Sequence, residues 1–183
     1  VLWWGTCYRQ KRDLSKLVRP HLEKLRDLTS ETAAFSIMMG NQTVVVEQAI
    51  SPYATSTRFD IGFSAPLHAG ATGRVVLAHL DPERRKNLLS QSLERFTERT
   101  ITDKRRLEQE LNKCLTQGFA FSEGERLIGT SSIAAPILGP EKDVLGVISV
   151  TGPSARLTHR RCKSIASTLL KETRILTQQL NKA

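Results

Sequence analysis

Two pairs of short apolar segments, each joined by a short turn, restrict this chain to a fold built on an antiparallel sheet. Residues 33–39 (AAFSIMM) and 43–50 (TVVVEQAI) are rich in apolar and β-branched side chains, and Gly40-Asn41 between them favours a turn. Residues 131–138 (SSIAAPIL) and 144–151 (VLGVISVT) flank GPEKD, which has the composition of a turn. Strands joined by such short turns pair antiparallel, so we predict two hairpins.

Helical periodicity elsewhere supplies the layers that would cover such a sheet. Residues 14–28 carry apolar side chains at helical spacing, and Pro20 inside that pattern predicts a kink or a new helix start. The other expected elements are helices over 69–80, from Asp81-Pro82-Glu83, from 102 or 103 to Gly118 and from about 158, with short strands at 58–61 and 119–122. The predicted class is α+β, an antiparallel sheet covered by helices.

The composition predicts the number of domains and the cellular compartment, but it says little about function. A chain of 183 residues with 39% hydrophobic residues is long enough for one domain with a core. It has no apolar run of membrane-spanning length and no signal peptide, so no membrane contact is expected. Cys7, Cys114 and Cys162 are odd in number and share no CxxC spacing, which favours a reduced, cytoplasmic compartment.

The net charge of +9 leaves direct binding to nucleic acid open as an alternative. The densest basic runs lie on or beside predicted amphipathic helices, where solvated helix faces are the favoured interpretation. Only 5% of the residues are aromatic, and no nucleic-acid recognition motif is present. These runs are Arg9 to Arg12, Arg84 to Lys86, Lys104 to Arg106 and Arg160 to Lys163.

The sequence carries no catalytic, metal-binding or cofactor motif. Its four histidines lack the HExxH spacing, and GxSxG, GxGxxG and the phosphate loop of nucleotide-binding proteins are all missing. His68 is the one plausible general base, and we interpret it as a helix-start residue bonded to the backbone. We predict no catalytic residue, no metal and no cofactor.

A cluster of small and hydroxyl-bearing residues points instead to a binding site. Residues 66–80 (PLHAGATGRVVLAHL) place almost volumeless side chains at 69–73, where a helix begins. The N-terminus of a helix offers free N–H groups and the positive end of its dipole. Alternation along the strands puts Ser149 and Thr151 on one face, and Ser132 begins a similar face on the neighbouring strand. Together these features predict a receptor for a small anion such as a carboxylate.

Four segments stand out by their order and spacing: LVRPHLEKLRDLTSETA (17–33), PLHAGATGRVVLAHL (66–80), GFAFSEGERLIGTSSIAAPIL (118–138) and VLGVISVTGPSARLT (144–158). Together they resemble the C-terminal effector-binding domain of the IclR family of bacterial transcription regulators. The resemblance implies a GAF-like domain that binds a small-molecule effector. It also implies dimers or tetramers, with operator DNA bound by an N-terminal winged helix-turn-helix domain that this chain does not include.

The resemblance also implies a domain division and a pocket. Residues 1–13 would end a linker helix, with Leu2, Trp3 and Trp4 packing on a neighbour, and residues 14–183 would form the effector-binding domain. Ser122 stands where many members carry Asp, which should change the ligand preference. Carried over by position, the pocket would be lined by Ala65, Ala71, Thr72, Ser122, Thr130, Ser132, Ser149 and Thr151.

The resulting prediction is a ligand-sensing domain that is not an enzyme. Its effector would be a small hydroxy-, keto-, sugar or aromatic acid. One enzymatic alternative remains, because GAF-like domains include a small sulfoxide reductase with cysteines beside its pocket. That function would require Cys7, Cys114 and Cys162 to converge, and their predicted helical placements argue against it.

Overall fold

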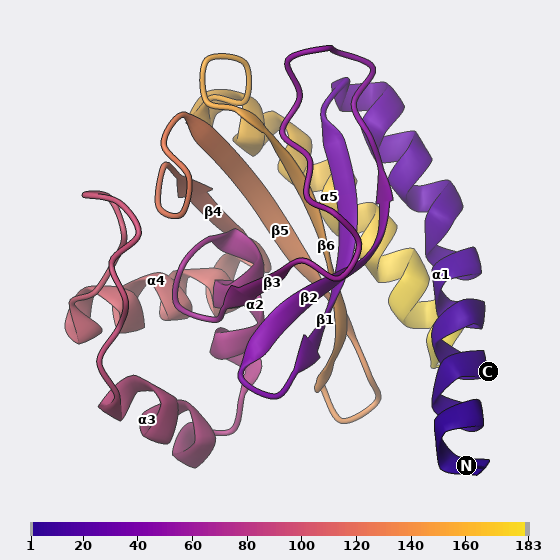
Figure 1. Cartoon of the computed structure of the whole chain (residues 1–183), viewed down its shortest axis with the longest axis horizontal. Coiled ribbons are helices and arrows are strands. Elements are labelled where there is room, and N and C mark those ends of the chain that lie inside the picture. The colour runs from indigo at the N-terminus through magenta and orange to yellow at the C-terminus, as the bar shows by residue number, and fades with distance from the viewer. Residues whose placement is uncertain (1, 182–183) are drawn as a thin grey trace.

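A six-stranded antiparallel sheet with helices on both faces forms the protein (Figure 1). The computed structural model describes the backbone of residues 2–181 and the side chains of residues 14–181. The helices are α1 (Leu2–Thr29), α2 (Ala71–His79), α3 (Pro82–Ser90), α4 (Lys104–Gln117) and α5 (His159–Leu180). The strands are β1 (Thr32–Met39), β2 (Gln42–Ala49), β3 (Ser64–Pro66), β4 (Ala120–Glu123), β5 (Thr130–Leu138) and β6 (Val144–Pro153). The predicted α+β class is confirmed.

Both predicted hairpins are present, and they meet at the centre of the sheet. The strand order is β3-β2-β1-β6-β5-β4. The turn between β1 and β2 contains Gly40 with a φ of 61°, a conformation that glycine adopts without strain. Strand β1 pairs with β6 from Thr32↔Thr151 to Ser36↔Val147. The N-terminal and C-terminal halves of the chain therefore share one continuous sheet.

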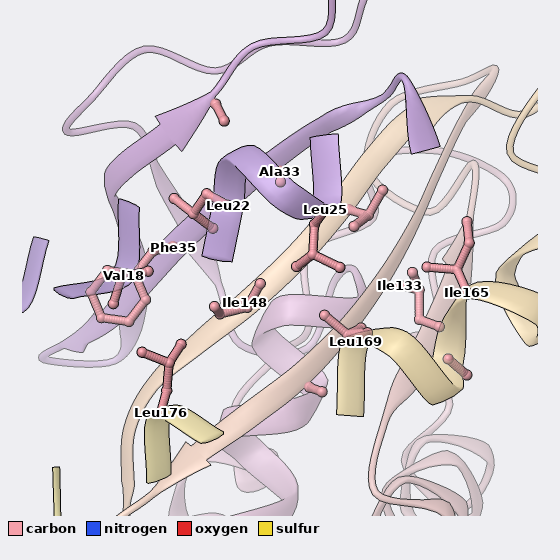
Figure 2. Packing of buried hydrophobic residues seen from close by; sticks show 14 of the residues in the cluster. Val18, Leu22, Leu25, Ala33, Phe35, Ile133, Ile148, Ile165, Leu169 and Leu176 are labelled. Carbon is pink, nitrogen blue, oxygen red and sulfur yellow. The ribbon is translucent and has the colours of Figure 1, made fainter. Parts of the chain in front are cut away.

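The two faces of the sheet hold separate apolar clusters. On one face, α1 and α5 cover the side chains of Phe35 and Ile148, and Figure 2 shows Leu22 and Leu169 among the residues packed there. On the other face, α2 and α4 pack their apolar side chains over Val147 and its neighbours. Each apolar helix face thus gains its stability by burial against the sheet. The second face is shared between this cluster and the cavity described below.

Helix boundaries follow the predicted capping signals. Asp81 and Asp103 each accept a backbone hydrogen bond from the third residue of the helix that they precede, both at 2.8 Å. Thr158 caps α5 in the same way. Gly118 ends α4 in the left-handed conformation, with a φ of 81°. These four boundaries agree with the sequence prediction.

One alternative at Pro20 and the position of one strand are wrong. A single helix, α1, runs through Pro20, so no new helix starts there, and the kink stays a prediction. Pro20 lies on the exposed side of α1, where water can bond the carbonyl left without a donor. The short strand expected at 58–61 lies instead at Ser64–Pro66, as β3. A turn from Asp60 to Phe63 occupies the predicted position, so regular pairing with β2 begins only after it. The side chains of Leu2, Trp3, Trp4 and Cys7 lie outside the described residues.

Candidate functional site

All eight of the predicted pocket residues line one cavity. It lies between the sheet and the N-terminus of α2, and it is the space left where small side chains replace bulky core residues. The volume that the centre of a water molecule can reach is about 90 Å³, which is room for a small molecule. The eight residues are Ala65, Ala71, Thr72, Ser122, Thr130, Ser132, Ser149 and Thr151.

Strand register brings the hydroxyl groups of the cavity together. Ser122 pairs with Ser132, and Ser132 pairs with Thr151, so one row of hydroxyls crosses β4, β5 and β6. The Thr151 hydroxyl donates to the Ser132 Oγ at 3.1 Å. Ser149 lies one step along, between Ala34 and Ala134, and its hydroxyl has no hydrogen-bond partner among the described residues. A hydroxyl that lines the cavity is free to bond water or a ligand there.

The N-terminus of α2 faces the same cavity and carries backbone N–H groups that have no acceptor among the described residues. The N-cap residue, Gly70, has a φ of 101° and supplies no capping side chain. The Ala71 N–H donates to the Ser122 Oγ at 3.1 Å. The N–H groups of Thr72 and Gly73 have no acceptor in the described part of the chain. Free N–H groups at the positive end of a helix dipole favour a bound anion.

Close packing explains the smallest residue of this segment. A Cβ on Gly73 would lie 2.5 Å from the carbonyl oxygen of Leu67, which is backbone and cannot move aside alone. The first turn of α2 therefore rests directly on the turn that precedes it. The small residues at 69–73 serve two purposes, because they permit this contact and they also line the cavity.

A buried ion pair at the edge of the cavity, with Glu125 among the residues that line it, is a feature that the sequence analysis missed. Arg74 is 1% exposed, and its Nη1 donates to the Glu125 Oε1 at 2.8 Å. Its Nη2 donates to the Phe121 carbonyl, and Glu125 Oε2 accepts the Gly70 N–H at 3.4 Å. Burial raises the pKa of Glu125, and the charge of Arg74 opposes that rise. The pair ties the start of α2 to the loop after β4.

Arg126 and two aromatic residues were also missed. Phe59, Phe63 and Arg126 line the cavity. All three lie in loops, where no periodicity indicates which way a side chain points. The adjacent run Glu125-Arg126 was visible in the sequence as a pair of opposite charges, but nothing marked either residue as part of a cavity.

His68 has the structural role that the sequence analysis favoured. It is buried, and its Nε2 donates to the Glu94 carbonyl at 2.8 Å. No histidine lines the cavity in the described part of the chain, so no imidazole base is near Ser132. Among the described residues, no group of three or more His, Cys, Asp or Glu side chains could hold a metal ion. No helix within residues 2–181 has the length and apolarity needed to cross a membrane.

The cysteine-based enzyme is contradicted by where the two described thiols lie. Cys114 belongs to the apolar cluster under α2 and α4, and Cys162 belongs to the cluster under α1 and α5. The sheet separates them, and neither lines the cavity. Two thiols on opposite faces of a sheet cannot act on one substrate.

Both of these thiols are expected to resist alkylation while the protein is folded. Burial raises the pKa of Cys114 to about 11 and that of Cys162 to about 12, so the reactive thiolate is scarce at neutral pH. Treatment with iodoacetamide, followed by mass spectrometry of each peptide, should show both residues unmodified in buffer and modified in urea. Equal labelling in both conditions would contradict their burial.

Comparisons with known proteins agree with this architecture. A family model described as bacterial transcriptional regulator IclR C-terminal matches residues 6–177. The HTH-type transcriptional regulator BhcR of Paracoccus denitrificans (strain Pd 1222) is 32% identical over 173 residues, which cover 94% of this chain and 62% of BhcR. The chain thus spans about three fifths of the length of the curated relatives it matches. These relatives are transcriptional regulators, not enzymes.

Two solved structures extend the comparison. An IclR transcriptional regulator from Silicibacter sp. TM1040 is 27% identical, with a TM-score of 0.90 over 99% of this chain and 72% of that one. The inducer-binding domain of the PobR transcription factor from Acinetobacter is similar in fold. It is 22% identical, with a TM-score of 0.82 over 89% of this chain and 97% of that one, and was solved as a double mutant with 3-hydroxybenzoic acid.

Proposed function

This chain belongs to the family of bacterial transcriptional regulator IclR C-terminal domains, and from that premise we propose that its cavity binds a small organic acid as an effector. The observation that carries the proposal is the cavity itself. It combines unpaired N–H groups at the start of α2 with the hydroxyl row of β4, β5 and β6. An acid supplies acceptors for the free N–H groups of α2 and further hydrogen-bond partners for the hydroxyl row.

The effector carboxylate would lie at the N-terminus of α2. The N–H groups of Thr72 and Gly73 would donate to it, aided by the helix dipole. The hydroxyls of Ser132, Ser149 and Thr151 would then bond a keto, hydroxyl or carboxylate oxygen on the rest of the molecule. The acid bound to the PobR domain supports this class of effector. Ser122 bonds the Ala71 N–H, and in this role it would shape the cavity wall.

The whole regulator would use this domain to control binding to operator DNA. In our proposal the DNA is bound by an N-terminal helix-turn-helix domain, and residues 1–13 form the end of the linker that leads to it. The protein would act in the cytoplasm as a homodimer or homotetramer. An effector alters such a regulator only if it binds one arrangement of the domains more tightly than the other.

Thermal unfolding of this domain tests the effector proposal directly. Lactate, pyruvate, gluconate and 3-hydroxybenzoate represent the four classes of acid. An acid present at about 100 times its dissociation constant should stabilise the folded state by roughly 2.7 kcal/mol, which raises the midpoint by several degrees. The Ser149→Ala variant should bind that acid about tenfold or more weakly, because one hydrogen bond to a charged group is lost.

The matched control is Ser131→Ala. Ser131 lies on β5 but is bonded to Ser154 at 2.9 Å, and it does not line the cavity. Its replacement should leave the increase caused by the acid intact, whatever it does to the midpoint without ligand. If no acid moves the midpoint while duplex DNA does, the effector site is refuted and the +9 charge becomes the better guide to function.

A further inference from the structure

Arg126 places a positive charge at the cavity and forms no close ion pair with a carboxylate of the described residues. The charge of Glu94 acts on it only from a greater distance and favours its charged form. It reaches the cavity from the loop between β4 and β5. Its Nη2 donates to the Ser64 carbonyl at 3.0 Å. Its Nη1 is buried and has no hydrogen-bond partner among the described residues. No Asp or Glu oxygen of the described residues lies within 4.0 Å of the guanidinium nitrogens.

Two aromatic rings lie against this guanidinium. Its central carbon lies 4.5 Å from the centre of the Phe63 ring and 5.6 Å from that of the Phe96 ring. Phe59 stacks on Phe63 with ring centres 4.5 Å apart. Burial lowers the pKa of Arg126, but a guanidinium stays charged at neutral pH. Cation–π contacts therefore fix a cation at the cavity wall without supplying an acceptor for Nη1.

Arg74, the other arginine near the cavity, differs from Arg126 because its guanidinium has an ion-pair partner. Arg74 is paired with Glu125 and with the Phe121 carbonyl, so its charge is already balanced within the protein. Glu125 also lines the cavity, and Arg74 balances its charge. Two electropositive groups there keep donors without an acceptor in the described part of the chain, namely the Thr72 and Gly73 N–H groups of α2 and the Arg126 Nη1. They come from different elements. A buried charged donor without a partner is costly, and a bound anion would remove that cost.

We propose that Arg126 sets the specificity of the site by binding the second carboxylate of a short dicarboxylic acid whose first carboxylate lies at the N-terminus of α2. This inference rests on the proposed function and narrows its ligand class. A planar guanidinium pairs well with a carboxylate, which can accept two parallel hydrogen bonds. The cavity of about 90 Å³ limits the spacer to a few carbon atoms. Hydroxyl groups on the sheet line the space between.

Succinate and succinamate test this proposal as a pair, because they have the same length and differ by one charge. Titration calorimetry should show that the domain binds succinate about tenfold or more tightly than succinamate. In Arg126→Gln the affinity for succinate should fall by about the same factor, and the affinity for succinamate should change little. Arg126→Lys keeps the charge but loses the planar fork, so it should give an intermediate preference.

The control variant is Arg95→Gln, which removes one positive charge nearby. Arg95 is exposed, bonds Thr102, and does not line the cavity. It should leave the preference for succinate unchanged, which separates a contact at Arg126 from a general effect of net charge. Circular dichroism should show that all three variants are folded, since both arginines lie in loops.

The possible results separate this inference from the function on which it rests. A preference for succinate that Arg126→Gln abolishes supports both. Equal binding of succinate and succinamate, or equal weakening of both in Arg126→Gln, overturns the role of Arg126 and leaves the organic-acid site standing. If neither these acids nor those of the thermal unfolding panel bind, the effector site and the role of Arg126 are both refuted.

Discussion

Replacing Arg74 with methionine is expected to lower the free energy of unfolding by about 3–5 kcal/mol at neutral pH. Methionine fills much of the same volume, so the loss comes from charge. Glu125 would remain buried without the guanidinium that balances it, and the Phe121 carbonyl would lose its donor. Urea denaturation followed by circular dichroism measures the change.

The pH dependence of this loss has a definite sign. The pKa of Glu125 in the folded protein is already above the ordinary value for a glutamate, because burial outweighs the opposing charge of Arg74. A carboxyl with a raised pKa contributes stability that is complete below its unfolded pKa and is lost as pH rises through its folded pKa. Removing Arg74 raises the folded pKa further. The deficit of Arg74→Met should therefore be small at pH 4.5 and below, and should grow towards neutral pH.

A second substitution identifies the source of the loss. In Arg74→Met/Glu125→Gln, a neutral amide replaces the carboxylate and can still accept the Gly70 N–H. This double variant should recover most of the stability at neutral pH and lose the pH dependence. If the double variant is no more stable than Arg74→Met, the unpaired carboxylate is not the cause. That result would contradict the buried position of the Arg74–Glu125 ion pair.

The Gly73→Ala substitution is expected to destabilise the protein by about 1–3 kcal/mol and to weaken binding of any acid at α2. Intrinsic helix propensity predicts the opposite sign, since alanine stabilises a helix interior by about 1 kcal/mol relative to glycine. The clash of the new Cβ with the Leu67 backbone at 2.5 Å decides the outcome. Relief of that clash must displace the start of α2, which carries the free N–H groups. Thermal unfolding with and without acid measures both effects.

Thr72→Ala is the matched control at the neighbouring position. It removes one hydroxyl and one methyl group without adding volume, and alanine has the higher helix propensity. Its stability should change by less than about 0.5 kcal/mol. A Gly73→Ala variant that is more stable than the wild type would show that α2 does not rest closely on the preceding turn.

The sequence predicts the parts of this site that lie on regular strands. Alternation alone placed Ser149 and Thr151 on one face, and the structure brings both to the cavity with Ser132 as a cross-strand neighbour. Ala65 and Ser122 were placed by resemblance only, because short segments show too little periodicity to indicate direction. Their role in ligand binding stays a prediction.

The features that the sequence could not predict depend on loop conformation and on ion pairs between residues far apart in the sequence. Arg74 has a helical position that suits either a buried or an exposed side chain, and its burial depends on Glu125, 51 residues away. Arg126 depends in the same way on Phe63 and Phe96, which come from two other loops. Strand β3 was misplaced for a related reason, since the turn from Asp60 to Phe63 shifts where pairing begins.

The pairing of β1 with β6 at the centre of the sheet has a consequence for how the protein folds. Each hairpin can form from residues close in sequence, but the β1–β6 ladder joins Thr32 to Thr151 and must wait for a large loop to close. The hydroxyl row of β4, β5 and β6 lies on one side of that ladder, and Ala65 on β3 lines the cavity from the other side. The cavity therefore comes into existence only with the last and slowest contacts. An effector can bind only molecules that have completed folding, so it slows their unfolding and does not guide the nascent chain.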